Sequence, residues 1–308
     1  MKKTRIIVFA VIIISVISIA FLFLFEAQQE ARRAAAENVA VINLRGTIAD
    51  GAGSLLGPQG VTPEYVANQL EKAEEDISVK AVVLRVDSPG GSVASSQEIA
   101  DLIKSSSQTI VVSMGDIAAS GGYYISARAD AIVAQPGTIT GSIGVITTLI
   151  NPEGLYEKLG LDVEVIKSGR HKDMMQRSLT EEERELLQDL SDEAYNQFIN
   201  EIAEGRDKDV EEVREVATGE LFLGSKAKRL GLVDELGGVN EAVKLAGEIE
   251  GLDDPQEYRF PDPTFFEILT GFALEFSDIF RNMFMPEDIL KLELLEEKLY
   301  PEIQYKYK

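Results

Sequence analysis

The first 25 residues differ in hydrophobic pattern from the rest of the chain. A cationic start, Met1 to Arg5, precedes a run from Ile6 to Phe25 that is apolar apart from Ser15 and Ser18. Twenty residues of helix span roughly 30 Å, the thickness of the hydrocarbon core of a bilayer. No clear small-x-small cleavage site follows this run. We therefore expect residues 6–25 to be an uncleaved transmembrane signal anchor rather than a secretory signal peptide.

Basic residues beside this run predict its orientation. Lys2, Lys3 and Arg5 favour a cytoplasmic position for residues 1–5, although Arg32 and Arg33 beyond the run weaken that preference. The polar segment 26–37 is then a spacer. Everything after it is expected to face outward, which makes the chain a single-pass protein of the cell membrane with an extracytoplasmic domain.

From residue 38 onward, short apolar runs of strand type alternate with helical patterns. Near-continuous apolar strands that alternate with helices predict an α/β fold with a parallel or mixed sheet covered by helices. Thr62-Pro63 is typical of a helix start, and Thr180 with Glu183 forms a capping box that opens a long helix. The expected strands are 39–44, 80–86, 109–114 and 131–134, and the expected helices are 63–73, 92–104, 120–128, 180–205, two shorter helices ending near Ala217 and Leu230, and 240–250.

The chain changes composition after residue 250. Pro255, Pro261 and Pro263 separate the tail, residues 251–308, from the preceding domain, and a stretch rich in phenylalanine follows. We expect this stretch to be a helix that packs on the domain or on a neighbouring subunit. An interfacial membrane helix is the alternative, which the acidic residues within the stretch disfavour.

Composition excludes several classes of function. The net charge of -22 and the pI near 4.5 argue against binding to nucleic acid and against broad adhesion to anionic lipid. There is no cysteine, so a cysteine nucleophile is excluded, and His171 is the single histidine.

No metal site is implied, because only carboxylates remain as ligands. No cofactor is implied either, because neither GxGxxG nor GxxxxGK[ST] occurs at the strand ends.

Three glycine-bearing loops follow predicted strands, at 87–92, 119–122 and 140–144. In an α/β sheet such loops gather at the carboxyl ends of the strands, where ligands usually bind. Glycine allows the backbone to approach a reacting atom closely. Acyl transfer needs amide donors directed at the oxygen of a tetrahedral intermediate. The amides of Gly90, Gly91 and Gly121 are therefore candidates for an oxyanion hole.

Four segments, taken together and in order, resemble a known family. They are Asp87-Ser88-Pro89-Gly90-Gly91, the run Gly115 to Tyr124 with Ala119-Ser120-Gly121-Gly122 at its centre, Thr140-Gly141-Ser142-Ile143-Gly144-Val145, and Ser168-Gly169-Arg170-His171-Lys172-Asp173. They look like the signature segments of signal peptide peptidase A. The resemblance covers about 38–250, and the single Ser-Gly-Gly segment matches the short forms that have one such domain. It implies a membrane-anchored serine protease with a ClpP/crotonase-like fold of repeated β-β-α units.

Carried over residue by residue, the resemblance implies a Ser–Lys dyad. Ser120 would be the nucleophile and Lys172 the general base, with Ser142 orienting the lysine amine. The amides near Gly90-Gly91 and Gly121 would form the oxyanion hole. In short forms of this family the serine and the lysine of one site are thought to come from neighbouring subunits of a homo-oligomeric ring.

A lysine base makes a physical demand on its surroundings. A free lysine has a pKa of about 10.4, and burial in an apolar pocket must lower that pKa by several units before the amine can accept a proton at neutral pH. Met174 and Met175 could supply such a pocket. A Ser120/His171/Asp173 triad is an alternative, but His171 and Asp173 flank Lys172 and would both point away from it in an extended segment.

The resulting hypothesis is a serine endopeptidase that cleaves hydrophobic extended peptides, such as remnant signal peptides, bound by β-augmentation. Two alternatives remain. One is a crotonase-like acyl-CoA enzyme, since that fold also builds an oxyanion hole from loop amides. The other is a non-catalytic scaffold that binds a membrane partner.

Overall fold

The computed structural model describes residues 36–50 and 60–260 of the chain. The anchor expected at residues 6–25 and the aromatic stretch of the tail lie outside these ranges. Within the described ranges, no helix is both long and apolar enough to cross a bilayer.

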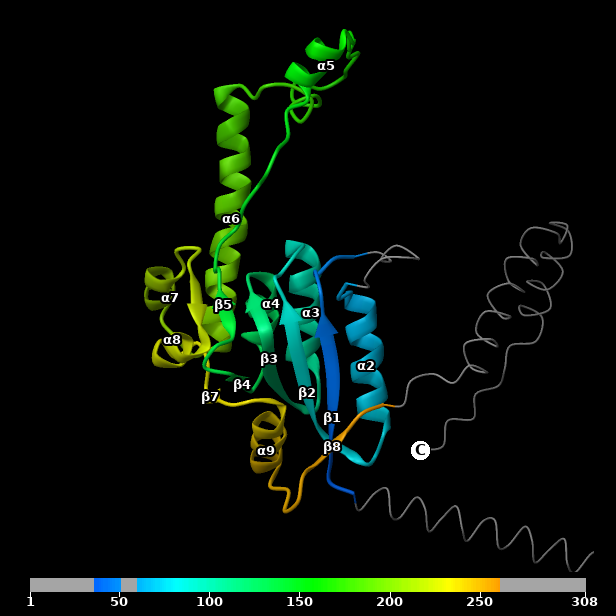
Figure 1. Cartoon of the computed structure of the whole chain (residues 1–308), viewed down its shortest axis with the longest axis vertical. Coiled ribbons are helices and arrows are strands. Elements are labelled where there is room, and N and C mark those ends of the chain that lie inside the picture. The colour runs from blue at the N-terminus through cyan, green and yellow to red at the C-terminus, as the bar shows by residue number, and fades with distance from the viewer. Residues whose placement is uncertain (1–35, 51–59, 261–308) are drawn as a thin grey trace, which may run out of the picture. The chain divides into compact units, whose positions relative to one another are not determined.

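One mixed sheet forms the centre of the protein (Figure 1). Its path runs β6-β5-β3-β2-β1-β8, and β4 pairs with β3 and with β7. Every pairing is parallel except that of β5 with β6, which is antiparallel. The strands are β1 (Asn38–Arg45), β2 (Val79–Ser88), β3 (Thr109–Ala119), β4 (Ala131–Ala134), β5 (Ile139–Gly141), β6 (Leu221–Leu223), β7 (Glu235–Leu236) and β8 (Gln256–Tyr258).

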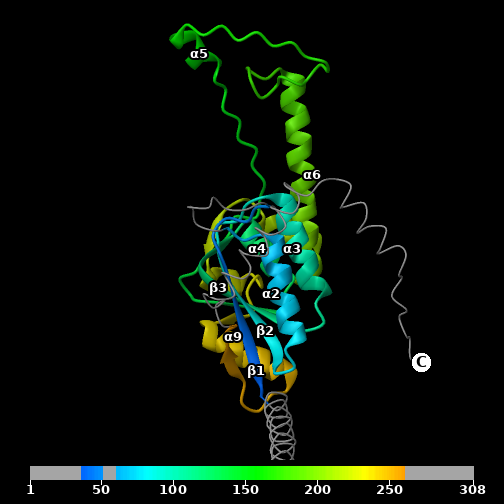
Figure 2. The same cartoon turned by 90° about the vertical axis from the view of Figure 1, so that its right-hand side faces the viewer.

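Helices cover both faces of this sheet (Figure 2). α9 packs on β2 and β3 from one face, while α2, α3 and α4 pack together on the other. The helices of the described residues are α2 (Pro63–Glu75), α3 (Val93–Ser105), α4 (Gly121–Ser126), α5 (Glu153–Leu159), α6 (Glu181–Gly205), α7 (Val210–Val216), α8 (Gly224–Arg229) and α9 (Val239–Glu250).

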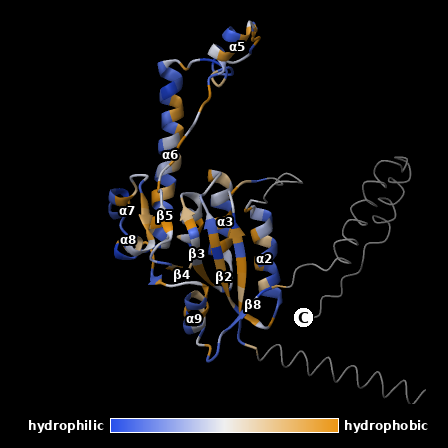
Figure 3. Ribbon diagram, in the orientation of Figure 1, coloured by the Kyte–Doolittle hydropathy of each residue, from blue (hydrophilic) through white to orange (hydrophobic). Residues whose placement is uncertain are grey.

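Burial on both faces explains the continuous apolar runs of the strands. Val83 belongs to the cluster beneath α9, whereas Val82 and Leu84 alternate with it along β2, and all three are fully buried. Figure 3 shows the same concentration of hydrophobic residues along the strands. The α/β class predicted from the sequence is confirmed.

Local signals mark the element boundaries well. The side chains of Thr62 and Thr180 cap α2 and α6 as the sequence indicates, and Thr180 forms the full capping box with Glu183. Ser92, expected as the first residue of its helix, is the N-cap of α3. β3 runs five residues beyond the predicted end at Met114, because its second half pairs with β2 and β5. β8 adds a strand beside β1 from a segment that the sequence places in the tail.

The segment before α6, residues 145–180, is here called the arm. It begins at the cleft-lining Val145 and Ile146 and runs beside α6; α5, which has no buried residue, lies at the N-terminal end of α6, away from the sheet (Figure 1). α6 has 25 residues, so it is roughly 37 Å long. Its C-terminal part packs on the rest of the domain through buried Phe198, Ile199 and Ile202.

Candidate active site

Strand register brings two of the glycine-bearing loops together. Ala119 at the end of β3 pairs with Gly141 at the end of β5, so the next residues, Ser120 and Ser142, leave the sheet side by side. The backbone N–H of Ser120 donates to the carbonyl oxygen of Gly141 at 2.9 Å. The sequence places both serines after strands, and the structure brings them to the same edge of the sheet.

Ser120 occupies a sharp turn between β3 and α4. Its φ of 53° lies in the left-handed region, which is uncommon for a residue other than glycine. It stands at the N-cap position of α4, yet its side chain makes no capping hydrogen bond. Strained strand-to-helix turns of this kind are known to expose a nucleophilic hydroxyl.

The loop after β2 approaches Ser120 so closely that it needs glycine. Gly90 has a φ of 100°, and a Cβ on it would lie 2.6 Å from the amide nitrogen of Gly121 and 2.8 Å from Cβ of Ser120. A Cβ on Gly121 would lie 2.5 Å from Oγ of Ser96 and 3.2 Å from the amide nitrogen of Gly91. The three glycines named from the sequence thus surround Ser120 at backbone distance.

Their amides are not equivalent. The N–H of Gly90 donates to Oγ of Ser88 at 3.1 Å. Within the described part of the chain, the N–H groups of Gly91 and Gly121 have no hydrogen-bond acceptor, and both residues line the cleft beside Ser120. Two free, adjacent backbone donors therefore face the space into which Ser120 opens.

This cleft has a volume of about 670 Å³ and lies between the glycine loops and α6. Ser120 and Ser142 both line it. Its wall combines apolar and aromatic side chains with polar ones such as Ser96, Gln188 and Thr218, and Tyr124 contacts Phe198 with ring centroids 5.0 Å apart. Burial raises the pKa of Tyr124 to about 12, so its hydroxyl stays protonated. Asp192 on α6 is the one charged residue in the described lining.

Lys172 does not line the cleft of its own chain. It lies in the arm, its side chain is exposed, and its amine has no hydrogen bond or ion pair with any residue that the structure describes. Of the two methionines that could cover it, Met174 is half-buried and Met175 is 63% exposed. A single chain therefore does not bring Ser120 and Lys172 together.

The Ser120/His171/Asp173 alternative gains no support. Neither His171 nor Asp173 lines the cleft. Nδ1 of His171 lies 3.1 Å from Oε1 of Glu183, at the start of α6. The expectation that this segment is extended is wrong, because residues 170–176 form consecutive turns, held by bonds such as that from the N–H of Met174 to the carbonyl of His171 at 3.2 Å.

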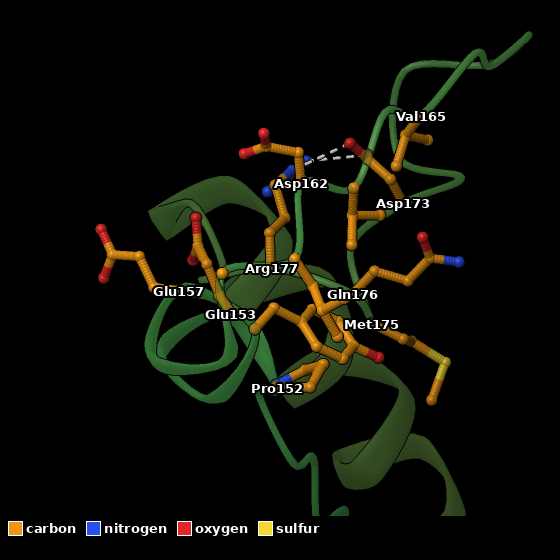
Figure 4. Close-up of a pocket in the computed structure, with 13 residues that line it drawn as sticks. Pro152, Glu153, Glu157, Asp162, Val165, Asp173, Met175, Gln176 and Arg177 are labelled. Atoms are coloured by element: carbon orange, nitrogen blue, oxygen red, sulfur yellow. Dashed lines mark hydrogen bonds and ion pairs between the residues drawn. The ribbon is translucent and has the colours of Figure 1, made fainter.

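A second cavity, of about 800 Å³, lies within the arm (Figure 4). Pro152, Tyr156, Val165 and the ion-paired Asp173 and Arg177 are among its lining residues. None of its lining residues in the described chain is a serine, threonine or lysine. It is larger than the cleft beside Ser120, but it offers no nucleophile for acyl transfer.

Sequence reasoning missed two contributors to these sites. Glu183 was recognised only as a capping residue, although its carboxylate also holds the segment around Lys172. Ser88 lay inside a recognised motif, but its contact with Gly90 required the folded loop. A polar residue that is fully buried, as both are, has no reliable signature in one sequence.

Comparisons with known proteins identify the family of this chain. The profile of peptidase family S49 matches residues 103–253, and the profile of Clp protease matches residues 59–136. The second match, together with the mixed sheet and its helices, fits a ClpP-like fold.

Similar proteins also indicate a peptidase. A protein of Synechocystis sp. named as a protease is 43% identical over 221 residues, which are 70% of this chain and 76% of the relative. A protein of Enterococcus faecium named as signal peptide peptidase SppA is 39% identical over 256 residues, 80% of this chain and 73% of the relative. Protease 4 of Haemophilus influenzae is 38% identical over 215 residues, 68% of this chain but 34% of the longer relative, so a short single-domain form fits. The chain therefore belongs to peptidase family S49 and is a serine peptidase of the signal peptide peptidase A family.

Proposed function

We propose that this peptidase is a membrane-anchored endopeptidase in which Ser120 attacks the scissile carbonyl and Lys172 of a neighbouring subunit accepts its proton. The observation that carries the proposal is the cleft itself. It combines a serine in a strained turn, its hydroxyl free of a capping bond, with the free amides of Gly91 and Gly121. Activated serine hydrolysis needs a nucleophile and oxyanion donors within a few ångströms of one another.

The reaction follows from these groups. The Ser120 hydroxyl transfers its proton to the neutral amine of Lys172 as its oxygen bonds to the carbonyl carbon of the peptide. The amides of Gly91 and Gly121 donate to the resulting oxyanion, while Gly90 supplies the space for this close approach. The tetrahedral intermediate collapses, the peptide amine leaves with the proton from Lys172, and water then hydrolyses the acyl-enzyme by the same sequence.

A neighbouring subunit supplies what one chain lacks. Lys172 is exposed and absent from the cleft of its own chain. The arm that carries it also exposes large apolar residues, among them Ile146, Ile150 and Ile166 at 83–93%. A second copy that covered this surface would bury Lys172 and lower its pKa, as a lysine base requires. Ser142 would then orient the amine inside the cleft, in a homo-oligomeric ring.

The cleft favours extended apolar peptides. Val93, Tyr124 and Phe198 line it, and a volume of about 670 Å³ suits several residues of peptide. Together with an anchor at residues 6–25, these features support remnant signal peptides in the membrane as substrates. Membership in a peptidase family favours this function over the acyl-CoA enzyme and the non-catalytic scaffold.

The test is peptide cleavage by the full chain and its variants. Ser120→Ala and Lys172→Ala should each lose at least about 1,000-fold in kcat/KM. The matched controls, Ser105→Ala and Lys158→Ala, change exposed residues outside the cleft and should behave like the parent. Mixing the two inactive variants should restore part of the activity. If Lys172→Ala cleaves as well as the parent, the dyad is wrong; if the mixture stays inactive, the site is not shared.

A further inference from the structure

The segment around Lys172 is held by a network of charged side chains. Arg177 donates through Nη2 to Oδ1 of Asp173 at 3.0 Å and to Oε1 of Glu183 at 2.7 Å, and through Nη1 to Oε2 of Glu183 at 2.8 Å. Lys167 donates to Oδ1 of Asp173 at 2.6 Å. These bonds tie residues 167–177, here called the lysine loop, to the first turn of α6.

Glu183 is the centre of this network. Its side chain is 1% exposed, although it lies where the chain has little other core. Besides Arg177, it accepts the backbone N–H of Thr180 at 3.0 Å and contacts Nδ1 of His171 at 3.1 Å. The Arg177 guanidinium, followed by the Thr180 amide, holds the pKa of Glu183 well below its usual range. One buried carboxylate therefore joins the helix start to both ends of the turn that carries Lys172.

Lys172 is the exception among the charged residues of the loop. Its charged neighbours all have partners, since Arg170 pairs with Glu182, and Asp173 pairs with Lys167 and Arg177. The amine of Lys172 has no partner among the described residues. The network thus orders the backbone of the loop and leaves the amine of Lys172 without a bond to any group in residues 36–50 and 60–260.

α6 connects this loop to the cleft. The helix begins at Glu181, beside the loop, and its residues from Gln188 to Phe198 line the cleft of the same chain. A capping box alone explains the bond between Glu183 and Thr180. It does not explain why the same carboxylate also binds Arg177 and His171 from the loop.

We propose that Glu183 is a positioning residue for Lys172, which holds the lysine loop on the first turn of α6 so that the amine is delivered in one orientation to the cleft of a neighbouring chain. This inference rests on the proposed role of Lys172 as the base. Glu183 contacts neither the substrate nor the reacting atoms, and it acts through the geometry of the loop. A misplaced base slows the reaction without weakening peptide binding, since the cleft that holds the peptide is built elsewhere.

The first test compares variants of the full-length protein. Glu183→Gln, which keeps the size but loses the charge, should lower kcat by about 10- to 100-fold with little change in KM. Glu183→Asp, which keeps the carboxylate, should recover part of that loss. The control Glu185→Gln changes an exposed acid on the same turn of α6 and should match the parent. A rise in KM without a fall in kcat would overturn the proposal. An equal fall in kcat in Glu183→Gln and Glu183→Asp would overturn it as well.

The second test uses mixed assemblies, because a purely structural role would act in either chain. In a mixture of Ser120→Ala and Lys172→Ala, only the Ser120→Ala chain donates the lysine. Glu183→Gln in the Ser120→Ala chain should lower the activity of the mixture. The same change in the Lys172→Ala chain should leave the activity of the mixture unchanged. Equal losses in both arrangements, or none in either, contradict the proposal.

The two proposals fail in different ways. Activity in the Lys172→Ala protein would remove the dyad itself and with it the role of Glu183. If Lys172→Ala is inactive and Glu183→Gln, assayed separately, is fully active, only the positioning role of Glu183 is removed. If the mixture never regains activity, the site is not shared, and delivery of the amine to the cleft of a neighbouring chain is wrong.

Discussion

The sheet domain and the arm of this peptidase bury their hydrophobic residues to opposite extents. Ile132 in β4 and Ile199 in α6 are fully buried, whereas Ile150 and Ile166 in the arm are 83% and 93% exposed. The domain is held by apolar packing on both faces of its sheet. The arm is held by charged pairs around Glu183, and most of its large apolar residues are exposed in the part of the chain that the structure describes.

This difference separates two requirements of the proposed site. Ser120 and the amides beside it depend on backbone geometry, which a close-packed sheet keeps constant. Lys172 depends on being carried to a second chain, which an arm with an exposed apolar surface suits better. The proposed nucleophile thus lies on the close-packed part of the molecule and the proposed base on the part suited to contact with a partner.

The largest expected effect is a loss of stability when a substitution leaves a cavity in the sheet domain. Ile132→Ala should lower the free energy of unfolding by about 2–5 kcal/mol, because the neighbours of a buried isoleucine only partly fill the space it leaves. Ile166→Ala in the arm should lower it by less than about 0.5 kcal/mol. Urea unfolding followed by circular dichroism measures both. Equal losses would show that the arm has a core of its own.

A smaller effect is expected on assembly and cleavage. Ile166→Asp should shift the protein toward single chains and lower kcat/KM by about 10-fold, because it places a charge in the proposed contact between copies. Light scattering gives the mass of the assembly, and peptide cleavage gives the rate. The control Ile77→Asp adds the same charge at an exposed isoleucine of the sheet domain and should change neither. An unchanged mass and rate for Ile166→Asp would separate the arm from assembly.

The smallest effect is a loosening of the arm in acid. Arg177, followed by Lys167, lowers the pKa of Asp173 to about 2, and Arg177 lowers that of Glu183 as well. Carboxylates with lowered pKa values stabilise the folded arm above their ordinary pKa, near 4, and lose that contribution as the pH falls toward 2. Hydrogen-exchange protection of residues 167–177 should therefore fall between pH 5 and pH 2.5, before that of β2 and β3.

The control for this prediction is Asp173→Asn, which removes one of the titrating groups. Its lysine loop should be less protected at pH 5 than that of the parent and should lose less further protection on acidification. If the parent loop keeps its protection at pH 2.5, the ion pairs do not hold the arm.

Local chemistry explains why much of the fold could be predicted. Thr62, Ser92 and Thr180 each mark a helix start, because a capping hydroxyl bonds to an amide only three residues away. β4 matches its predicted bounds, 131–134, because a short apolar run between polar turns allows few other structures. The second half of β3 could not be predicted, because polar Asp116 interrupts the apolar pattern and pairing with β2 and β5 decides the outcome.

By itself, the sequence determined the α/β class, the positions of the longer helices and of strands β1 to β4, and the motifs that contain Ser120, Ser142 and Lys172, because these depend on residues close together in the chain. Only the tertiary structure decided that Ser120 and Ser142 share a cleft, since the pairing of Ala119 with Gly141 joins separate strands. It also decided that the amide of Gly90 is occupied while those of Gly91 and Gly121 are free, and that Lys172 lies on an arm outside its own cleft. Contacts between distant residues depend on how elements pack, and local preference does not contain that information.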